Sequence, residues 1–394
     1  MVKIGLKLVV NLRNCYFVLM NKLLVSILFC TAFFLKAAQA QLHFEKLSEL
    51  EGASIGYLVR ELETGNVLAQ HDASRLLAPA SVLKLFTTAA ALDQFGSDKT
   101  ITSSFHRNGD VKNGVLHGDL IFDGNYNPTF LAERYGQSMD VLCEELIAKL
   151  KSIGVDTIRG NIKVFDGQSS ITSIPRTWIW EDIGNYYGAG FSRTIINENI
   201  LKLYLKSGKV GSKVEVLRTE PSLPWLTIYS EVFASSVNRD LAYCFSRPGD
   251  KEITITGTIP ANRNSFLVKA SLPDPSYTFA VLLHQALQKK GIIVAGNPLV
   301  DRRMDRSQLV HKTASPSMSA MVRKTNQMSL NIYAESLLKM LENEVVRVSG
   351  EASWDMKELL GQYFDVKTMK VYDGSGLSRF NAVSAKQVVD LITW

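Results

Sequence analysis

Alternation of polar and apolar residues dominates the start of the patterned sequence. Residues 54–71 contain two strand-like runs, SIGYLVREL and VLAQH, on either side of the turn residues 63–66, which predicts a β-hairpin. Pro79 then precedes a run from about residue 81 to 95 that is apolar on almost every face, and Gly96 follows it. Proline before such a run and glycine after it predict a buried helix.

The middle of the chain is rich in short strand-like runs. Residues 99–274 contain segments such as IRGNIKVFDG and EITITGTIP, interrupted by one predicted amphipathic helix at 139–153. From residue 277 the helical periodicity returns. Strands between two helical ends predict an α/β or α+β protein in which a β-rich insertion, 99–274, splits a domain made of 41–98 and 275–394.

The first forty residues have the layout of an export signal. From Met20 a basic start at Lys22 leads into an apolar run and then into residues 38–40, Ala-Gln-Ala, a small-x-small cleavage site. We expect cleavage after Ala40, with residues 1–19 as an extension from an upstream start codon and an uncleaved anchor as the alternative. The apolar run is short for a membrane span, so the sequence predicts an exported, periplasmic protein with at most peripheral membrane association.

The net charge looks different once this signal is set aside. The 394 residues carry a formal charge of +6, and residues 1–40 contribute five lysines and arginines and no acid, so the remainder carries only +1. A nearly neutral body does not attract nucleic acid, and no nucleic-acid partner is expected. The sequence contains no Gly-x-Gly-x-x-Gly or phosphate loop, and its six histidines lack metal-like spacing, so neither cofactor nor metal is predicted.

Two cysteines and two tryptophans outside the signal bear on packing. Cys143 and Cys244 form either one disulfide or two buried free thiols, and free thiols are favoured because Cys143 lies in the apolar stripe of VLCEELIAKL. We interpret Trp178 and Trp180 as buried residues that pack in the core of the insertion. The alternative is that their rings stack on glycan.

The first predicted helix carries a candidate catalytic pair, Ser81 and Lys84, in the pattern Ser-x-x-Lys. Residues three apart share a helix face, so the amine can reach the hydroxyl. Lys84 is the only charged residue in SVLKLFTTAAAL, and burial lowers the pKa of such an amine toward a value useful for a base. A serine at a helix N-terminus also lies near backbone N–H groups that stabilise negative charge. These features predict that Ser81 is a nucleophile activated by Lys84.

Two further polar motifs occur near the C-terminal helices. Ser336 and Lys339 repeat the Ser-x-x-Lys pattern inside an ordinary amphipathic helix, and we interpret this repeat as coincidence. Ser329 and Asn331 lie just before that helix and fit the position of the Ser-x-Asn element that accompanies Ser-x-x-Lys in penicillin-binding proteins and class A β-lactamases. The alternative is a plain helix N-cap formed by Ser329.

Longer stretches make the resemblance more specific. The chain is similar to the D-alanyl-D-alanine carboxypeptidase/endopeptidase family of class C low-molecular-mass penicillin-binding proteins, in the stretches LAPASVLKLFTTAAAL, GVLHGDLIFDGNYNPTF, NYYGAGFSRTIINENIL and VYDGSGLSRFN. The similarity runs from about residue 50 to the C-terminus, and Asp373–Arg379 is its most distinctive part. It implies an α+β fold, a penicillin-binding-protein/β-lactamase-like transpeptidase domain with a large β-rich two-part insertion.

The resemblance also implies a role for each motif residue. Ser81 is the acyl-forming nucleophile and Lys84 its general base. Ser329 relays a proton toward the leaving D-alanine, and Asn331 binds the substrate peptide carbonyl. The implied reaction cleaves the D-Ala-D-Ala bond or a D,D-crosslink of a peptidoglycan stem peptide through a serine ester, and β-lactams are trapped as slow acyl analogues. The alternative is a non-catalytic relative that binds peptidoglycan or a partner protein.

The sequence departs from the family pattern in two places. The Lys-Thr-Gly motif, which the resemblance places after Asp373–Arg379 on a strand at the active site, does not occur before the last residue, Trp394. That strand would supply a cationic clamp on the substrate carboxylate and one oxyanion-hole N–H. The second departure is Asn127, where relatives often have an aspartate before Pro-Thr. If that acid faces the amino group of the substrate's diamino acid, Asn127 weakens a substrate contact.

The first departure leads to a prediction about residues 41–394. We expect this chain to be a weak or inactive enzyme and poorly stable, because loss of one oxyanion-hole donor typically costs ~10²–10³ in rate and loss of a central strand exposes a sheet edge. Hydrolysis of a D-Ala-D-Ala peptide by the purified chain measures the activity. A rate normal for the family would contradict the expectation.

Overall fold

The computed structural model describes residues 48–167, 173–305, 307–345 and 352–394. The predicted signal, residues 1–40, lies outside this part of the chain, and so the signal stays a prediction. The described residues form two compact units, one that joins the segment before residue 78 to Ser384–Trp394 and one that runs from Ala78 to Val383. Among the described residues no helix is both long and apolar enough to cross a membrane.

The smaller unit combines a hairpin with one helix. Strand β1 (Tyr57–Arg60) pairs antiparallel with β2 (Val67–His71), which confirms the hairpin predicted from the alternating pattern. Helix α9 (Ala385–Thr393) contacts β1, and Arg60 forms an ion pair of 2.8 Å with Asp390 of this helix. Helix and hairpin therefore support each other within this unit.

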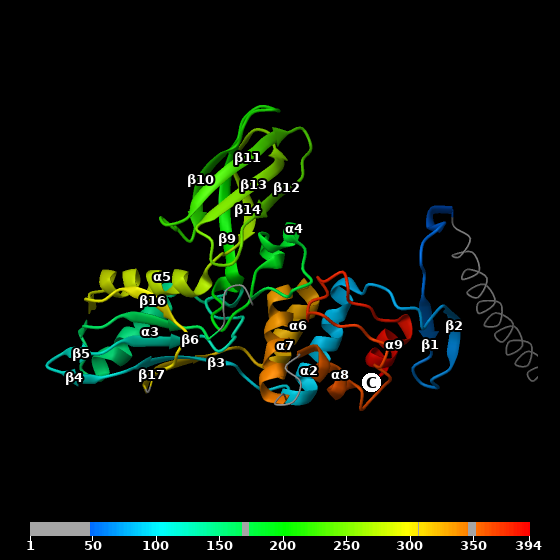
Figure 1. Ribbon diagram of the computed structural model, residues 1–394, viewed down its shortest axis with the longest axis horizontal. Coiled ribbons are helices and arrows are strands. Elements are labelled where there is room, and N and C mark those ends of the chain that lie inside the picture. The colour runs from blue at the N-terminus through cyan, green and yellow to red at the C-terminus, as the bar shows by residue number, and fades with distance from the viewer. Residues whose placement is uncertain (1–47, 168–172, 306, 346–351) are drawn as a thin grey trace, which may run out of the picture. The chain divides into compact units, whose positions relative to one another are not determined.

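Helix α2 is the centre of the helical part of the larger unit. It spans Leu83–Phe95 and contacts α6 (Met318–Met328), α7 (Asn331–Val345) and α8 (Ala352–Leu360), which lie around it in Figure 1. The predicted helix is therefore present, and Gly96, with a φ of +77°, ends it. Contacts on several sides explain why the sequence of α2 is apolar on almost every face.

Most strands of the described chain lie in the larger unit. Their bounds are β3 (Thr102–Arg107), β4 (Asp110–Lys112), β5 (Val115–His117), β6 (Leu120–Asp123), β7 (Thr157–Ile158), β8 (Ile162–Phe165), β9 (Ile200–Ser207), β10 (Glu215–Glu220), β11 (Thr227–Ser235), β12 (Leu241–Phe245), β13 (Glu252–Pro260), β14 (Arg263–Ser271), β15 (Ile293–Val294), β16 (Pro298–Asp301) and β17 (Gln308–Ala314). The strand orders are β16-β8-β6-β3-β17, β15-β7-β5-β4, β10-β9-β14 and β11-β13-β12. In the first sheet β16, β8 and β6 are parallel, and β3 is antiparallel to both β6 and β17.

Two long helices pack with the five-stranded sheet. Helix α3 (Met139–Ser152) contacts β17, and α5 (Pro275–Lys289) contacts β8 and β16. Helix α3 matches the amphipathic helix predicted at 139–153. The remaining short elements are η1 (Ser48–Leu50), η2 (Ala80–Val82), η3 (Glu133–Tyr135), α4 (Trp180–Ile183), η5 (Tyr186–Gly188) and η6 (Asn197–Asn199).

Strand pairing corrects the predicted end of the β-rich part. The sequence assigned residues after 274 to the catalytic domain, but β16 pairs with β8 and β17 pairs with β3, so this sheet extends to Ala314. Helical periodicity at 275–289 shows that one face is buried without showing whether a sheet or another helix covers it. The division into catalytic and inserted domains stays a prediction, with this boundary moved.

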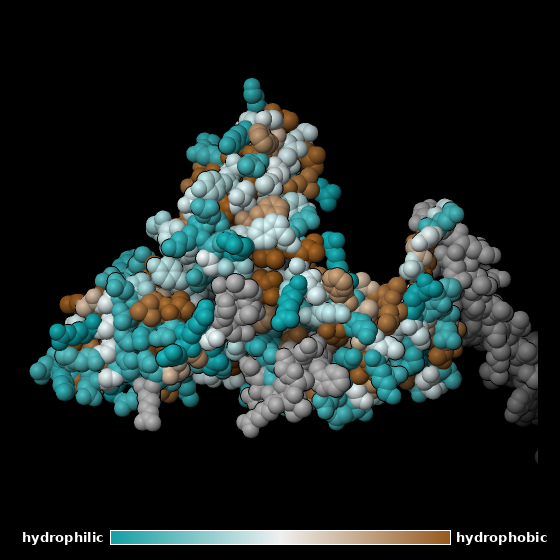
Figure 2. All heavy atoms as spheres, viewed as in Figure 1, coloured by the Kyte–Doolittle hydropathy of each residue, from teal (hydrophilic) through white to brown (hydrophobic). Residues whose placement is uncertain are grey.

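The strands between residues 200 and 271 alternate between buried and more exposed positions. In β9, Leu201, Leu203 and Leu205 are fully buried, and the residues between them are partly exposed. Hydrophilic and apolar residues are correspondingly interspersed on the face of this region that Figure 2 shows. A period of two is the pattern of a strand buried on one face, which is why the sequence revealed these strands.

The cysteine prediction and half of the tryptophan prediction are confirmed. Cys143 and Cys244 are buried free thiols, and burial raises the pKa of Cys143 to about 11 and that of Cys244 to about 12. Trp178 is buried, whereas Trp180 is 52% exposed, so its predicted burial was wrong. Trp180 is the first residue of the four-residue helix α4, and this short helix leaves its side chain exposed. The ring centroid of Trp180 lies 6.2 Å from that of Phe245.

We predict that Phe279→Ala destabilises the larger unit strongly. The fully buried ring of Phe279 lies 4.4 Å from Phe122 and 5.3 Å from Phe130, measured between centroids. Removing such a ring typically costs about 3–5 kcal/mol of unfolding free energy. Urea denaturation measures the change, with Phe380→Ala as a matched control because that phenylalanine is 65% exposed. Equal losses in the two variants would contradict the assignment of Phe279 to the core.

Candidate active site

Ser81 lies on a strained turn at the start of α2. It is the second residue of η2, and its side chain is exposed. Ala80, directly before it, has a φ of +45°, a left-handed conformation that residues other than glycine rarely adopt. Such strain of order 1–3 kcal/mol persists where the surrounding structure holds the residue in place, and it is frequent at active sites.

Lys84 reaches Ser81 from inside the protein. The lysine is only 1% exposed, and its Nζ donates hydrogen bonds to Ser81 Oγ at 3.0 Å and to the Ser375 carbonyl at 2.7 Å. Burial lowers the pKa of Lys84 to about 8, although the nearby carboxylates of Glu335 and Asp373 act in the opposite direction. The neutral amine, which can accept a proton from Ser81, is therefore accessible near physiological pH.

Ser329 approaches the same hydroxyl from another helix. It lies at the C-terminal end of α6 with a φ of +54°, and its Oγ donates to Ser81 Oγ at 2.8 Å. Ser329 is thus the C-cap residue of α6, and its hydroxyl is bonded to Ser81. Ser81 and Ser329 lie 248 residues apart in the sequence. The side chains of Lys84 and Ser329 thus converge on one oxygen atom, the Oγ of Ser81.

Asn331 lines the pocket beside this triad. It is the first residue of α7, and its Nδ2 donates to the Tyr187 carbonyl at 2.7 Å. An amide nitrogen carries two donors, and this bond uses one of them. The pocket has a volume of about 320 Å³. Its lining residues are Ser81, Tyr186, Tyr187, Glu198, Ile200, Met328, Ser329, Leu330, Asn331 and Ile332.

One wall of this pocket contains a partly buried ion pair, Arg134 with Glu198. Glu198 is 6% exposed, and its carboxylate accepts hydrogen bonds from Arg134, at 2.7 Å for the Nη2 contact, and from the Tyr333 hydroxyl at 2.9 Å. Because the guanidinium neutralises the carboxylate, this wall contributes little net charge to the pocket.

Asn127 is not part of the pocket. It is 2% exposed, and its Oδ1 accepts from the backbone N–H and the hydroxyl of Thr129 at 3.0 and 2.8 Å. Its Nδ2 donates to Ser103 Oγ at 3.2 Å. An asparagine side chain that bonds the backbone two residues on stabilises a turn. The structure thus places Asn127 in a structural turn, and the suggested contact with substrate has no support in its geometry.

The second Ser-x-x-Lys motif is structural, as the sequence interpretation held. Ser336 is fully buried and donates to the carbonyl of Tyr126. Lys339 pairs with Glu342 of the same helix at 2.5 Å. The two motif side chains thus have separate partners, and the pattern alone does not create a reactive serine.

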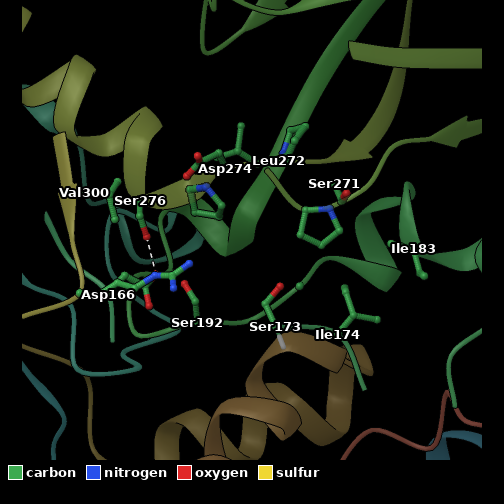
Figure 3. A pocket seen from close by; sticks show the side chains of 15 residues that line it. Asp166, Ser173, Ile174, Ile183, Ser192, Ser271, Leu272, Asp274, Ser276 and Val300 are labelled. Atoms are coloured by element: carbon green, nitrogen blue, oxygen red, sulfur yellow. Dashed lines mark hydrogen bonds between the residues drawn. The ribbon is translucent and has the colours of Figure 1, made fainter. Parts of the chain in front are cut away.

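A different pocket, shown in Figure 3, lies at the start of α5 and has a volume of about 280 Å³. Ser276 donates to Asp166 there at 2.6 Å, and burial raises the pKa of Asp274. Its lining residues are Asp166, Ser173, Ile174, Ile183, Gly190, Ser192, Pro248, Ser271, Leu272, Pro273, Asp274, Pro275, Ser276, Val300 and Arg302. It includes none of the motif residues, so it is not the reactive site.

Sequence reasoning assigned no site role to two carboxylates close to Lys84. Glu335 and Asp373 are each 1% exposed. A signal for Glu335 was present, because on α7 it lies three residues from the apolar Ile332 and Leu338, and an acid on an apolar helix face needs a buried partner. Asp373 entered the reasoning only as part of a family motif.

Comparison with known proteins identifies the relatives of this arrangement. Residues 36–393 match the D-Ala-D-Ala carboxypeptidase 3 (S13) family. The chain belongs to this family. The D-alanyl-D-alanine carboxypeptidase of Actinomadura sp. (strain R39) is 28% identical over 367 residues, which are 87% of this chain and 64% of that protein. This chain thus spans less than two thirds of the length of that relative.

A solved structure with a similar fold is that of penicillin binding protein 4 (dacB) from Haemophilus influenzae. It superposes with a TM-score of 0.72 at 23% sequence identity and covers 86% of this chain and 74% of that one. This likeness shows the fold, an α+β fold of the penicillin-binding-protein type, and confirms the predicted fold class. The family match likewise confirms the predicted family.

The lowered pKa of Lys84 predicts the pH dependence of Ser81 reactivity. With the neutral amine as the expected base, the rate of acylation of Ser81 by an activated ester should rise with pH through about 8 and level off above it. Lys84→Arg should reduce the rate by about 10² or more, because a guanidinium stays protonated at every accessible pH. Stopped-flow rates between about pH 6 and pH 10 measure both effects. A flat profile in the unchanged chain would exclude Lys84 as the base.

Proposed function

We propose that the protein is a serine D,D-peptidase that acts on the D-Ala-D-Ala terminus or a D,D-crosslink of peptidoglycan stem peptides. The observation that supports this most directly is the convergence of Lys84 Nζ and Ser329 Oγ on Ser81 Oγ, at 3.0 and 2.8 Å. Membership of the D-Ala-D-Ala carboxypeptidase 3 (S13) family supports the choice of substrate.

The proposed reaction is acyl transfer to water through a serine ester. Ser81 Oγ attacks the carbonyl carbon of the penultimate D-alanine, and its proton passes to the neutral amine of Lys84. When the C–N bond breaks, the proton held by Lys84 passes through the hydroxyl of Ser329 to the leaving amino group, which leaves Lys84 neutral again. Water then attacks the ester carbonyl, with Lys84 again as base, and releases the shortened peptide and free Ser81.

Asn331 is proposed to hold the substrate backbone in this pocket. One N–H of its amide donates to Tyr187, which fixes the side chain at the start of α7. The other donor is then directed by the same planar group and suits a peptide carbonyl. No metal or cofactor takes part in the proposed steps.

β-Lactams are the proposed inhibitors, and the periplasm is the proposed location. The dacB protein of Haemophilus influenzae has also been solved in complex with a novel β-lactam, and that structure covers 87% of this chain at 21% identity with a TM-score of 0.68. The export signal expected at residues 1–40 supports a periplasmic location, where peptidoglycan substrates occur.

Labelling with a fluorescent penicillin tests the proposal. We predict a stable covalent adduct on Ser81 in the unchanged chain, together with release of D-alanine, at a rate below that normal for the family, from a peptide that ends in D-Ala-D-Ala. Ser81→Ala should abolish the adduct, because the ester oxygen is absent. Ser336→Ala, at the serine of the structural motif, serves as the matched control and should still be labelled.

Two outcomes distinguish a catalytic D,D-peptidase from a non-catalytic relative that binds peptidoglycan. Ser81-dependent label with D-alanine release establishes catalysis. A folded chain that forms no Ser81-dependent adduct but still sediments with purified peptidoglycan would instead support the non-catalytic, peptidoglycan-binding alternative.

A further inference from the structure

The backbone carbonyl and N–H groups of residues 374–376 form hydrogen bonds with side chains near Ser81. The Gly374 carbonyl accepts from Thr87 Oγ1 at 2.7 Å, and the Ser375 carbonyl accepts from Lys84 Nζ at 2.7 Å. Both acceptors thus face α2, the helix that follows Ser81. A loop placed in this way sets the position of the lysine amine, because a carbonyl oxygen can only accept.

Glu335 holds the same loop from the opposite side. Its carboxylate accepts from the Gly374 N–H at 3.1 Å and from the Ser375 N–H at 2.8 Å. The Ser375 residue therefore lies between Glu335, which binds its N–H, and Lys84, which binds its carbonyl. Two titratable side chains on different helices are joined through a single residue.

The loop also packs too closely for any side chain at its two glycines. A Cβ at Gly376 would lie 1.7 Å from the carbonyl oxygen of Ala80, the residue before the nucleophile. A Cβ at Gly374 would lie 2.7 Å from the carbonyl oxygen of Ala334, beside Glu335 on α7. The loop is thus wedged between the nucleophile turn and α7, and a shift of either is transmitted to the other.

Asp373 anchors the beginning of this loop. Its carboxylate accepts four N–H bonds, from Gly376 at 2.8 Å, Ser378 at 2.6 Å, the Asn381 side chain at 2.8 Å and the Trp178 indole at 2.7 Å. These bonds fix the turn independently of Glu335. The side chain of Glu335 is therefore left with one set of partners, the N–H groups directly before the carbonyl that Lys84 binds.

We propose that Glu335 is a positioning residue for the general base: by binding the Gly374 and Ser375 N–H groups it fixes the Ser375 carbonyl, which in turn directs the lone pair of Lys84 at Ser81. This rests on the proposed function, because it assigns Lys84 the role of base. A neutral lysine amine has two N–H donors and one lone pair. When one N–H is bound to the Ser375 carbonyl, rotation about the Cε–Nζ bond is restricted and the lone pair can face Ser81 Oγ.

The charge of Glu335 gives this role a second consequence. The charged groups that act on Lys84 are Glu335 from α7 and Asp373 from the loop, and both raise the pKa of the amine against the effect of burial. Burial in turn raises the pKa of Glu335 to about 8, while the N–H groups of the loop lower it. Removal of the Glu335 charge should therefore lower the pKa of Lys84 and move its titration to lower pH.

The test compares Glu335→Gln with Glu335→Asp in the full chain. Glu335→Gln keeps the length of the side chain but has one acceptor oxygen and no charge. We expect its rate constant for acylation by a fluorescent penicillin to fall about tenfold or more at saturation. The rising part of its pH–rate profile, called the pH limb below, should shift to lower pH. Glu335→Asp keeps the charge but shortens the reach, so its rate should fall with little shift of the limb.

Two controls separate this role from general destabilisation. Thr87→Val removes the hydroxyl that holds the Gly374 carbonyl, and Thr87→Ser restores it, so the first should slow acylation and the second should recover it. Thr278→Val makes the same change at an equally buried position on α5 and should leave acylation unchanged. These variants remain informative if Glu335→Gln fails to fold.

Hydrogen exchange supplies a measurement that does not depend on activity. In Glu335→Gln the amides of Gly374 and Ser375 should exchange faster, while those of α5 should not change. Unchanged exchange, an unchanged acylation rate and an unchanged pH limb in folded Glu335→Gln would overturn the proposal. Absence of any penicillin adduct in the unchanged chain would instead count against the proposed function, and the exchange result would still decide whether Glu335 holds the loop.

Discussion

Burial of one amine is the constraint on which the reactive site depends. Lys84 is only 1% exposed and lies on α2, which packs against three other helices. Each polar group near it must therefore form a hydrogen bond either to its amine or to another partner. Its contacts are Ser81 Oγ and the Ser375 carbonyl, and its nearby charges are two buried carboxylates. A lysine with these neighbours keeps a lowered pKa without becoming an unpaired buried charge.

The same constraint explains why the site is assembled from distant segments. Ser81 and Lys84 are three residues apart, at the start of α2. Ser329 lies at the end of α6, and Ser375 lies in a loop after α8. None of these segments forms a closed set of hydrogen bonds by itself. The backbone is left-handed at Ala80, which packs closely against Gly376, and at Ser329, which is bonded to Ser81.

The β-rich part contributes to this arrangement through a few specific bonds. Trp178 donates to Asp373 at 2.7 Å, and Tyr187 accepts from Asn331 at 2.7 Å. Both contacts reach residues that border the nucleophile, one through the loop that begins at Asp373 and one at the start of α7. The segment between β8 and β9, together with Ile200 at the start of β9, therefore supplies part of the pocket wall.

Sequence by itself determined the local elements and the contact between Ser81 and Lys84, the candidate catalytic pair. The hairpin at 57–71, the buried helix after Pro79 and the pair Ser81 and Lys84 followed from periodicity and spacing, because these features depend on residues close together in the chain. The family resemblance added Ser329 and Asn331, which the structure brings to the same pocket.

Tertiary structure decided what local pattern does not encode. It moved the end of the β-rich sheet to Ala314 and exposed Trp180, because periodicity shows that a face is buried without naming its neighbour. It placed Asn127 in a turn and brought Glu335 to the loop that holds Lys84. The longer sheet and the Glu335 contact rest on pairing between separate segments of the chain, such as β17 with β3, and such contacts form only when the whole core has packed.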